Sequence, residues 1–139
     1  MNTHVILFFD GVCNLCSVSV DFLLRFRSKK ADFKIASLQG ETALKYLPLS
    51  ISKDLKLQGP SSVIVLLKDG QILTGYEAIQ YLVRFLLFPL NFLYSFILWI
   101  FSPLGNVLYK WVAANRYRWF GKKSSCRLPT SAERTFFLP

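Results

Sequence analysis

Cysteine and histidine are scarce in this chain, which has three cysteines and one histidine in 139 residues. Three cysteines are too few for a small secreted scaffold held by several disulfides. A complete zinc site needs about four ligands. Besides the neighbouring Cys13 and Cys16, the remaining candidates are Cys126, Asp10 and His4, and there is no second Cys-x-x-Cys pair. The sequence therefore predicts neither a disulfide framework nor a metal site.

Acidic residues are also few: eight Asp and Glu oppose 17 Lys and Arg, and the formal net charge is +9. The excess is uneven, because residues 81–139 hold eight basic residues and one acid, Glu133. Such a charge favours acidic partners, for example nucleic acid or anionic lipid. The basic residues are too dispersed to specify one partner, and no nucleic acid is predicted.

A secretion signal is not visible. Residues 1–4 lack the basic region of a signal peptide, and Val5–Phe9 is too short for its apolar segment. We therefore expect a cytoplasmic location. In that reducing compartment a Cys-x-x-Cys pair indicates redox chemistry or metal binding rather than a structural disulfide.

The chain also lacks an uninterrupted apolar run of membrane-spanning length. Residues 85–101 are strongly apolar, but Pro89, Asn91 and Ser95 interrupt them. A spanning helix needs about 20 predominantly apolar residues, and Pro89 leaves roughly a dozen. We expect a buried helical hairpin that covers the core. The alternative is peripheral membrane contact, helped by the basic C-terminal tail.

Core-forming residues, in contrast, are plentiful. Hydrophobic residues make up 53% of the chain, and 13 of them are phenylalanine. This content excludes a disordered chain, and the length fits one domain with a substantial core.

The most informative stretch joins a strand to a helix through two cysteines. Val5–Phe9 is continuously apolar, as in a strand buried on both faces, and it ends at Asp10-Gly11. From Leu15 onward apolar residues recur at helical intervals. Cys13 is thus expected at a helix N-terminus, where unpaired N–H groups and the helix dipole favour a thiolate. Cys16 follows one turn later, and we interpret the pair as a thiol–disulfide redox site.

The remaining patterns predict an α/β fold. The expected elements are a helix over 13–27, a strand over 33–38, a helix over 41–46, strands over 62–67 and 71–74, and a helix over 76–88. With the first strand, residues 1–88 give the β-α-β-α-β-β-α order of a thioredoxin- or glutaredoxin-like core. Residues 89–139 are expected to form a helical C-terminal extension packed on that core, within a single domain. Its main helix should begin at Ser102-Pro103 and stop at Gly121.

The block from Phe9 to Cys16 resembles the signature of the DCC family of predicted thiol–disulfide oxidoreductases, named for an Asp-x-x-Cys-x-x-Cys pattern. The resemblance continues in residues 36–39, 62–66, 76–78 and 115–121, and at Cys126. It implies a thioredoxin-like core with a helical C-terminal extension. It also maps the three defining positions of the family onto Asp10, Cys13 and Cys16.

The expected mechanism is exchange through a mixed disulfide: Cys13 attacks a substrate disulfide as the thiolate, and Cys16 resolves the mixed species. Asp10 has two alternative roles, as general base for Cys16 or as acceptor for backbone N–H groups of the turn. The implied partners are protein or small-molecule thiols and disulfides. The cysteine pair itself is the redox group, and no cofactor is predicted.

Substrate binding is expected near Pro60, Ser61 and Ser62. Thioredoxin-like proteins resemble one another in placing a cis-proline before the third strand, opposite the disulfide. Pro60 is near that position, although Ser61 and Ser62 intervene. If one of the serines occupies the position, the substrate groove differs from that of thioredoxin.

A second class of function stays open, a non-catalytic thioredoxin-like binding module attached to a membrane or partner through its C-terminal half. An enzyme needs an accessible thiolate at Cys13, and a binding module does not. Arg116 and Arg118 are interpreted as exposed helix charges that need no function, or as positive charge near the site. Cys126 is either a buried apolar residue, which we favour slightly, or a third redox thiol.

Overall fold

The computed structural model of the chain describes residues 4–51, 63–122, 124 and 128–139. Its centre is a four-stranded mixed sheet in the order β2-β1-β3-β4. The strands are β1 (Val5–Phe9), β2 (Phe33–Ser37), β3 (Val63–Leu66) and β4 (Ile72–Thr74). β1 is parallel to β2 and antiparallel to β3, and β3 is antiparallel to β4. This arrangement is compatible with a thioredoxin-like fold and confirms the predicted fold class.

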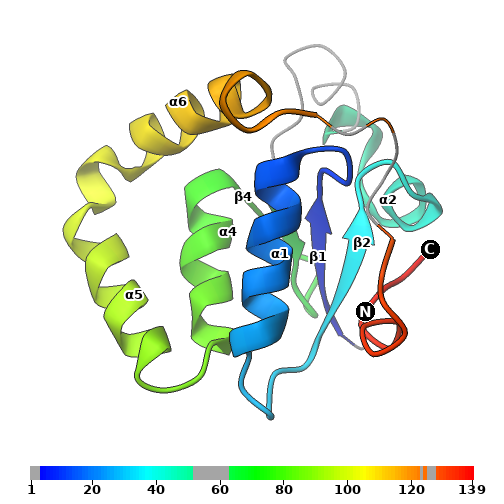
Figure 1. The fold of residues 1–139 in the computed structure, drawn as a ribbon, viewed down its shortest axis with the longest axis horizontal. Helices are drawn as coiled ribbons and strands as arrows, with labels where there is room; N and C mark the ends of the chain where they lie inside the picture. Colours follow the sequence, from blue (N-terminus) through cyan, green and yellow to red (C-terminus); the bar gives the residue numbers. More distant parts are fainter. Residues whose placement is uncertain (1–3, 52–62, 123, 125–127) are drawn as a thin grey trace.

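Helices cover both faces of the sheet (Figure 1). The helical elements are α1 (Asn14–Phe26), α2 (Glu41–Tyr46), α4 (Gly75–Leu82), the 3-10 turn η1 (Val83–Phe85), α5 (Leu90–Ile100) and α6 (Ser102–Phe120). Every residue of β1 is buried, as its continuous apolar character predicts. Alternate residues of this strand contribute to two core clusters, one shared with α1 and α4 and the other with α2.

The C-terminal segment extends the sheet edge beside β2. The Ile35 N–H donates to the Phe136 carbonyl at 2.6 Å, and the Leu138 N–H donates to the Ile35 carbonyl at 2.7 Å. At the end of the chain, the Pro139 carbonyl accepts the Thr42 N–H at the start of α2. The last residues therefore pack against the core, next to α2 in Figure 1.

The helix expected over 76–88 is shorter than predicted. α4 ends at Leu82, and after η1 the chain becomes extended at Leu86, which forms a bridge with Arg27. Two backbone hydrogen bonds hold this bridge, from Ser28 N–H to the Phe85 carbonyl and from Leu87 N–H to the Phe26 carbonyl. Pairing with the end of α1 thus replaces the last helical turns, although Val83 and Leu86 stay buried at helix-like spacing.

The prediction of a buried helical hairpin for the apolar segment over 85–101 is wrong. α5 and α6 are bent by 96° relative to each other, and α5 contains no buried residue. A helix that is apolar on every side can turn only one of its sides toward the core, so the other sides of α5 stay exposed. Within the described residues no single helix has the length and apolar character needed to cross a membrane, whereas the bent pair α5 and α6 meets that test jointly.

Candidate active site

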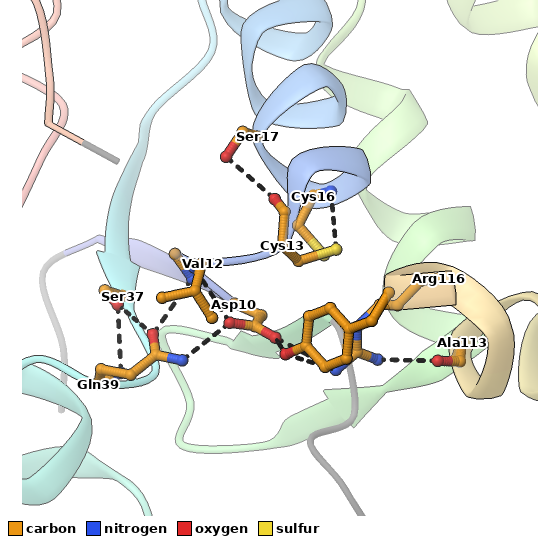
Figure 2. A network of polar contacts seen from close by, with 11 residues as sticks. Asp10, Val12, Cys13, Cys16, Ser17, Ser37, Gln39, Ala113 and Arg116 are labelled. Atoms are coloured by element: carbon orange, nitrogen blue, oxygen red, sulfur yellow. Dashed lines mark hydrogen bonds and ion pairs between the residues drawn. The ribbon is translucent and has the colours of Figure 1, made fainter. Parts of the chain in front are cut away.

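Cys13 is the N-cap residue of α1, and its sulfur accepts the backbone N–H of Cys16 at 3.4 Å. A tight turn presents it there, because the Cys13 N–H donates to the Asp10 carbonyl at 3.2 Å. Both cysteines are in the reduced thiol form and lie at the start of the helix (Figure 2). The backbone thus offers Cys13 a hydrogen-bond donor and the positive end of the α1 dipole, which together favour a negative sulfur.

Asp10 is fully buried below the cysteines and holds four hydrogen-bond donors. Its Oδ1 accepts the Val12 N–H at 3.2 Å and the Gln39 amide at 2.8 Å. Its Oδ2 accepts Arg116 at 3.2 Å and the hydroxyl of Tyr117. The contact with Val12 is of the kind expected for an acceptor of the turn's N–H groups. The other three donors were not expected from the sequence.

Gln39 connects this carboxylate to the end of β2. Its side-chain oxygen accepts the Gly11 N–H at 3.1 Å and the Ser37 hydroxyl at 2.6 Å, while its amide donates to Asp10. One glutamine therefore fixes both the turn before Cys13 and the carboxylate beneath it.

Arg116 contradicts the interpretation of an exposed helix charge. Its side chain is 3% exposed, although it lies on α6, 106 residues after Asp10 in the chain. The guanidinium lies over the ring of Tyr117 and also donates to the Ala113 carbonyl at 3.3 Å. Arg118, two residues later, is exposed as predicted. The helical extension thus contributes a buried cation to the site.

The environment favours the protonated forms of Cys16 and Tyr117. Burial is the main cause that raises the pKa of Cys16, and the hydrogen bond and charge of Cys13 raise it further, while Arg116 opposes the shift. Burial also raises the pKa of Tyr117, and the hydrogen bond to Asp10 adds to the effect. Cys16 is therefore held as a thiol and Tyr117 as a neutral donor.

The end of α6 covers Cys13, which has no exposed surface. Lys122 forms a β-bridge with Cys13, and the Asn14 side chain donates to the Phe120 carbonyl at 2.8 Å. Gly121 makes the close approach feasible, since its φ is +82° and a Cβ there would lie 3.0 Å from the Asn14 amide nitrogen. Residues 120–122 are called the cover below.

An apolar cavity of about 320 Å³ borders Cys16, and residues 120–122 are not among the residues that line it. It opens between α1, α4 and the two C-terminal helices, and Cys16, Arg116, Tyr94 and Tyr109 are in its wall. Cys16 thus borders an apolar space, whereas Cys13 contacts the backbone of the cover.

Other sequence-predicted positions are placed elsewhere or are not described. Pro60, Ser61, Ser62 and Cys126 lie outside the described residues. His4 hydrogen-bonds Asp32 at 2.7 Å on the surface, away from the cysteines. In the part of the chain that the structure describes, no three His, Cys, Asp or Glu residues are grouped as metal ligands would be.

Comparison with known proteins agrees with this geometry. The profile of the family described as DCC1-like thiol-disulfide oxidoreductase matches residues 7–122. The "Uncharacterized protein YuxK" of Bacillus subtilis (strain 168) is 34% identical over 134 residues, which are 96% of this chain and 93% of that protein. The "DCC family protein At1g52590, chloroplastic" of Arabidopsis thaliana is 32% identical over 125 residues, which are 88% of this chain and 69% of that protein. No solved structure matches the chain.

Proposed function

Because this chain belongs to the DCC1-like thiol-disulfide oxidoreductase family, we propose that it exchanges dithiols and disulfides through Cys13 and Cys16. The family name implies oxidoreductase activity in general. The observation that carries the specific proposal is the hydrogen bond from the Cys16 N–H to the Cys13 sulfur at the start of α1. Helix N-termini of this kind activate cysteines as nucleophiles.

In the proposed reaction Cys13 is the nucleophile. Its thiolate attacks one sulfur of a substrate disulfide R–S–S–R′, forms the Cys13–S–S–R mixed disulfide and releases R′S⁻. Cys16 then attacks the Cys13 sulfur, its proton passes to the leaving group as RSH, and a Cys13–Cys16 disulfide forms. Two electrons thereby move from the protein to the substrate, and the reverse steps oxidise a substrate dithiol.

The raised pKa of Cys16 supports this assignment of roles. A thiol that keeps its proton does not compete with Cys13 for the substrate, and it must be activated only when the mixed disulfide has formed. Arg116 lowers the pKa of Cys16 against the effect of burial. We therefore assign to Arg116 the stabilisation of the Cys16 thiolate during resolution.

Asp10 fits a positioning residue better than a general base. Its carboxylate already accepts hydrogen bonds from Val12, Gln39, Arg116 and Tyr117. The two oxygens of a carboxylate offer about four lone-pair sites, and these four donors occupy them, so no site is left for a proton from Cys16. In this proposal Asp10 acts by holding Arg116 next to Cys16.

We propose protein or low-molecular-weight thiols and disulfides in the cytoplasm as substrates. No further cofactor is required, because the two thiols supply both electrons. The cover has to move before a substrate disulfide can reach Cys13, which has no exposed surface in the described conformation. The same burial favours a second candidate, a non-catalytic binding module in which the cysteines are core residues.

Trapping the mixed disulfide distinguishes the two candidates. A Cys16→Ser, Cys126→Ser variant, incubated with oxidised glutathione, should accumulate glutathione on Cys13, which intact-mass measurement detects. A Cys13→Ser, Cys126→Ser variant is the matched control and should stay largely unmodified. Alkylation of Cys13 in the first variant, followed over a range of pH, tests whether the thiol can be reached in the folded protein. If Cys13 is labelled at no pH while the protein is folded, the binding-module function is the correct one.

A further inference from the structure

The outer side of α5 is apolar and exposed, which is unusual for a helix that faces water. Its inner residues Leu90, Tyr94 and Leu98 recur every four positions and pack against the core. On the other side, Trp99 is 72% exposed, and Phe96 and Ile100 are each 51% exposed. A helix with water on its outer side normally carries polar residues there.

The first half of α6 continues this apolar surface. Leu104 is 59% exposed, Val107 66% and Trp111 58%. We call residues 90–111, which comprise α5 and the start of α6, the elbow. Figure 1 shows these helices at the margin of the molecule, on the far side of α1 and α4 from the sheet.

Charge in the stretch of sequence next to the elbow has one sign only. Residues 85–109 contain no charged residue, and residues 78–132 contain no Asp or Glu. Two exposed basic residues, Arg84 and Lys110, flank the uncharged stretch. Two more, Arg118 and Lys122, follow further along the chain and are also exposed. An apolar surface bordered by cations is complementary to a bilayer with anionic headgroups.

The tryptophans point to the same partner. The chain has three, Trp99, Trp111 and Trp119, and all are on α5 or α6 with exposures of 45–72%. Tryptophan is enriched at the boundary between membrane and water, because its ring is apolar while its N–H needs a polar partner.

A second copy of the chain and a spanning arrangement fit less well. Self-association through the elbow would bring Arg84 and Lys110 of two chains toward one another without any acid between residues 78 and 132. Spanning is disfavoured because α5 has 11 residues, about 16 Å of helix against a hydrocarbon thickness of about 30 Å, and the bend of 96° prevents α6 from continuing it in a straight line.

We propose that the elbow docks this protein on the surface of anionic bilayers, with α5 and the start of α6 lying in the interface. The inner side of α5 stays on the core, and the outer aromatic side enters the boundary between headgroups and acyl chains. This inference is independent of the redox chemistry, so a Cys13→Ser variant should dock like the unchanged protein.

Vesicle binding by the full chain tests the proposal. Vesicles of phosphatidylcholine alone are compared with vesicles that also contain phosphatidylglycerol, by flotation and by tryptophan emission. We expect flotation with the anionic vesicles and a shift of the emission to shorter wavelength, because all three tryptophans are on α5 and α6. High salt should weaken the binding without abolishing it, since apolar burial is not screened.

The matched variants are Leu93→Glu on α5 and Leu44→Glu on α2, where the leucines are 50% and 78% exposed. Both place one new acid on an exposed leucine, so the net charge changes equally. Leu93→Glu should weaken vesicle binding by about tenfold or more, because it removes a leucine from the bilayer contact, and Leu44→Glu should have little effect. Equal loss in both variants would show general electrostatic attraction and overturn docking through the elbow.

Two further outcomes would also overturn the proposal. One is absence of binding to either vesicle by a chain that circular dichroism shows to be folded. The other is a lipid-free dimer, seen by sedimentation, that Leu93→Glu dissociates, because the elbow would then be covered by a second copy.

Discussion

At both ends of the C-terminal extension, the exposure of the side chains is the opposite of what their composition suggests. The elbow is apolar and contains no charge before Lys110, yet most of its side chains are exposed. The end of α6 is rich in arginine, yet Arg116 is almost completely buried and contacts Asp10. Burial therefore follows the availability of a partner: Arg116 has a buried carboxylate, whereas the outer side of α5 has nothing within the chain to cover it.

The largest effect is expected from breaking the buried ion pair. Arg116→Met leaves the Asp10 carboxylate buried without its cation, and removal of one partner of such a pair costs about 3–5 kcal/mol of unfolding free energy. Urea unfolding of the reduced protein measures the loss. A combined Asp10→Asn, Arg116→Met variant should recover part of it, because no uncompensated charge is left.

Arg118→Met is the matched control for this experiment, because Arg118 is an exposed arginine on the same helix. Its effect should stay within about 0.5 kcal/mol. Equal effects of the two arginine variants would show that the pair with Asp10 does not stabilise the fold.

Leucine truncation compares the covered and uncovered apolar sides directly. Leu24 on α1 is 4% exposed, and Leu93 on α5 is 50% exposed. Leu24→Ala should lower the unfolding free energy by about 2–5 kcal/mol, since it leaves a cavity. In lipid-free buffer Leu93→Ala should change it by about 0.5 kcal/mol or less. A large loss from Leu93→Ala would mean that something covers the elbow in solution.

At Gly105 the otherwise exposed start of α6 packs against Tyr76 of α4. A Cβ there would lie 2.3 Å from the ring of Tyr76, whose hydroxyl donates to the Leu98 carbonyl at 2.5 Å. Gly105→Ala should therefore destabilise the protein by about 1–3 kcal/mol, although the same change in an open helix stabilises by about 1 kcal/mol. In a Tyr76→Leu background the substitution should lose its cost. Stabilisation in the unchanged background would contradict the packing of α6 on α4.

The sequence predicts the first part of the site well because local patterns determine it. The apolar run before Asp10 and the helical spacing after Cys13 fix a strand, a turn and a helix, and the structure has all three. The order of the later strands follows in the same way from alternation and from the turn at Asp69-Gly70.

The partners of Asp10 could not be predicted in this way. The contact between Asp10 and Arg116 joins residues 106 positions apart, and no local period connects them. The available signal was indirect: an acid directly after a strand buried on both faces needs a compensating cation. The exposure of α5 escaped prediction because composition shows that a helix is apolar but does not show how many of its sides find a partner.

The smallest expected effect is a dependence of stability on pH. It tests the surroundings of Cys16, to which Arg116 at the end of α6 contributes. Folding raises the pKa of Cys16 above its ordinary value of 9.0, so the folded protein binds this proton more tightly than the unfolded chain does. The stabilisation is complete below about pH 9 and is lost as the pH rises further, by up to about 1.4 kcal/mol per pH unit for one group. Urea unfolding of the reduced protein between pH 8 and 10 should show this decline.

Cys16→Ser is the variant that isolates the contribution of Cys16, because serine does not ionise in this range while Cys13 and the tyrosines are retained. Its stability should fall less steeply above about pH 9 than that of the unchanged protein, by up to one proton. Parallel curves would mean that Cys16 loses its proton as easily in the folded protein as in the unfolded chain. Cys16 would then not keep its proton until the mixed disulfide forms. The difference in role between the two cysteines would have to come from Cys13 alone.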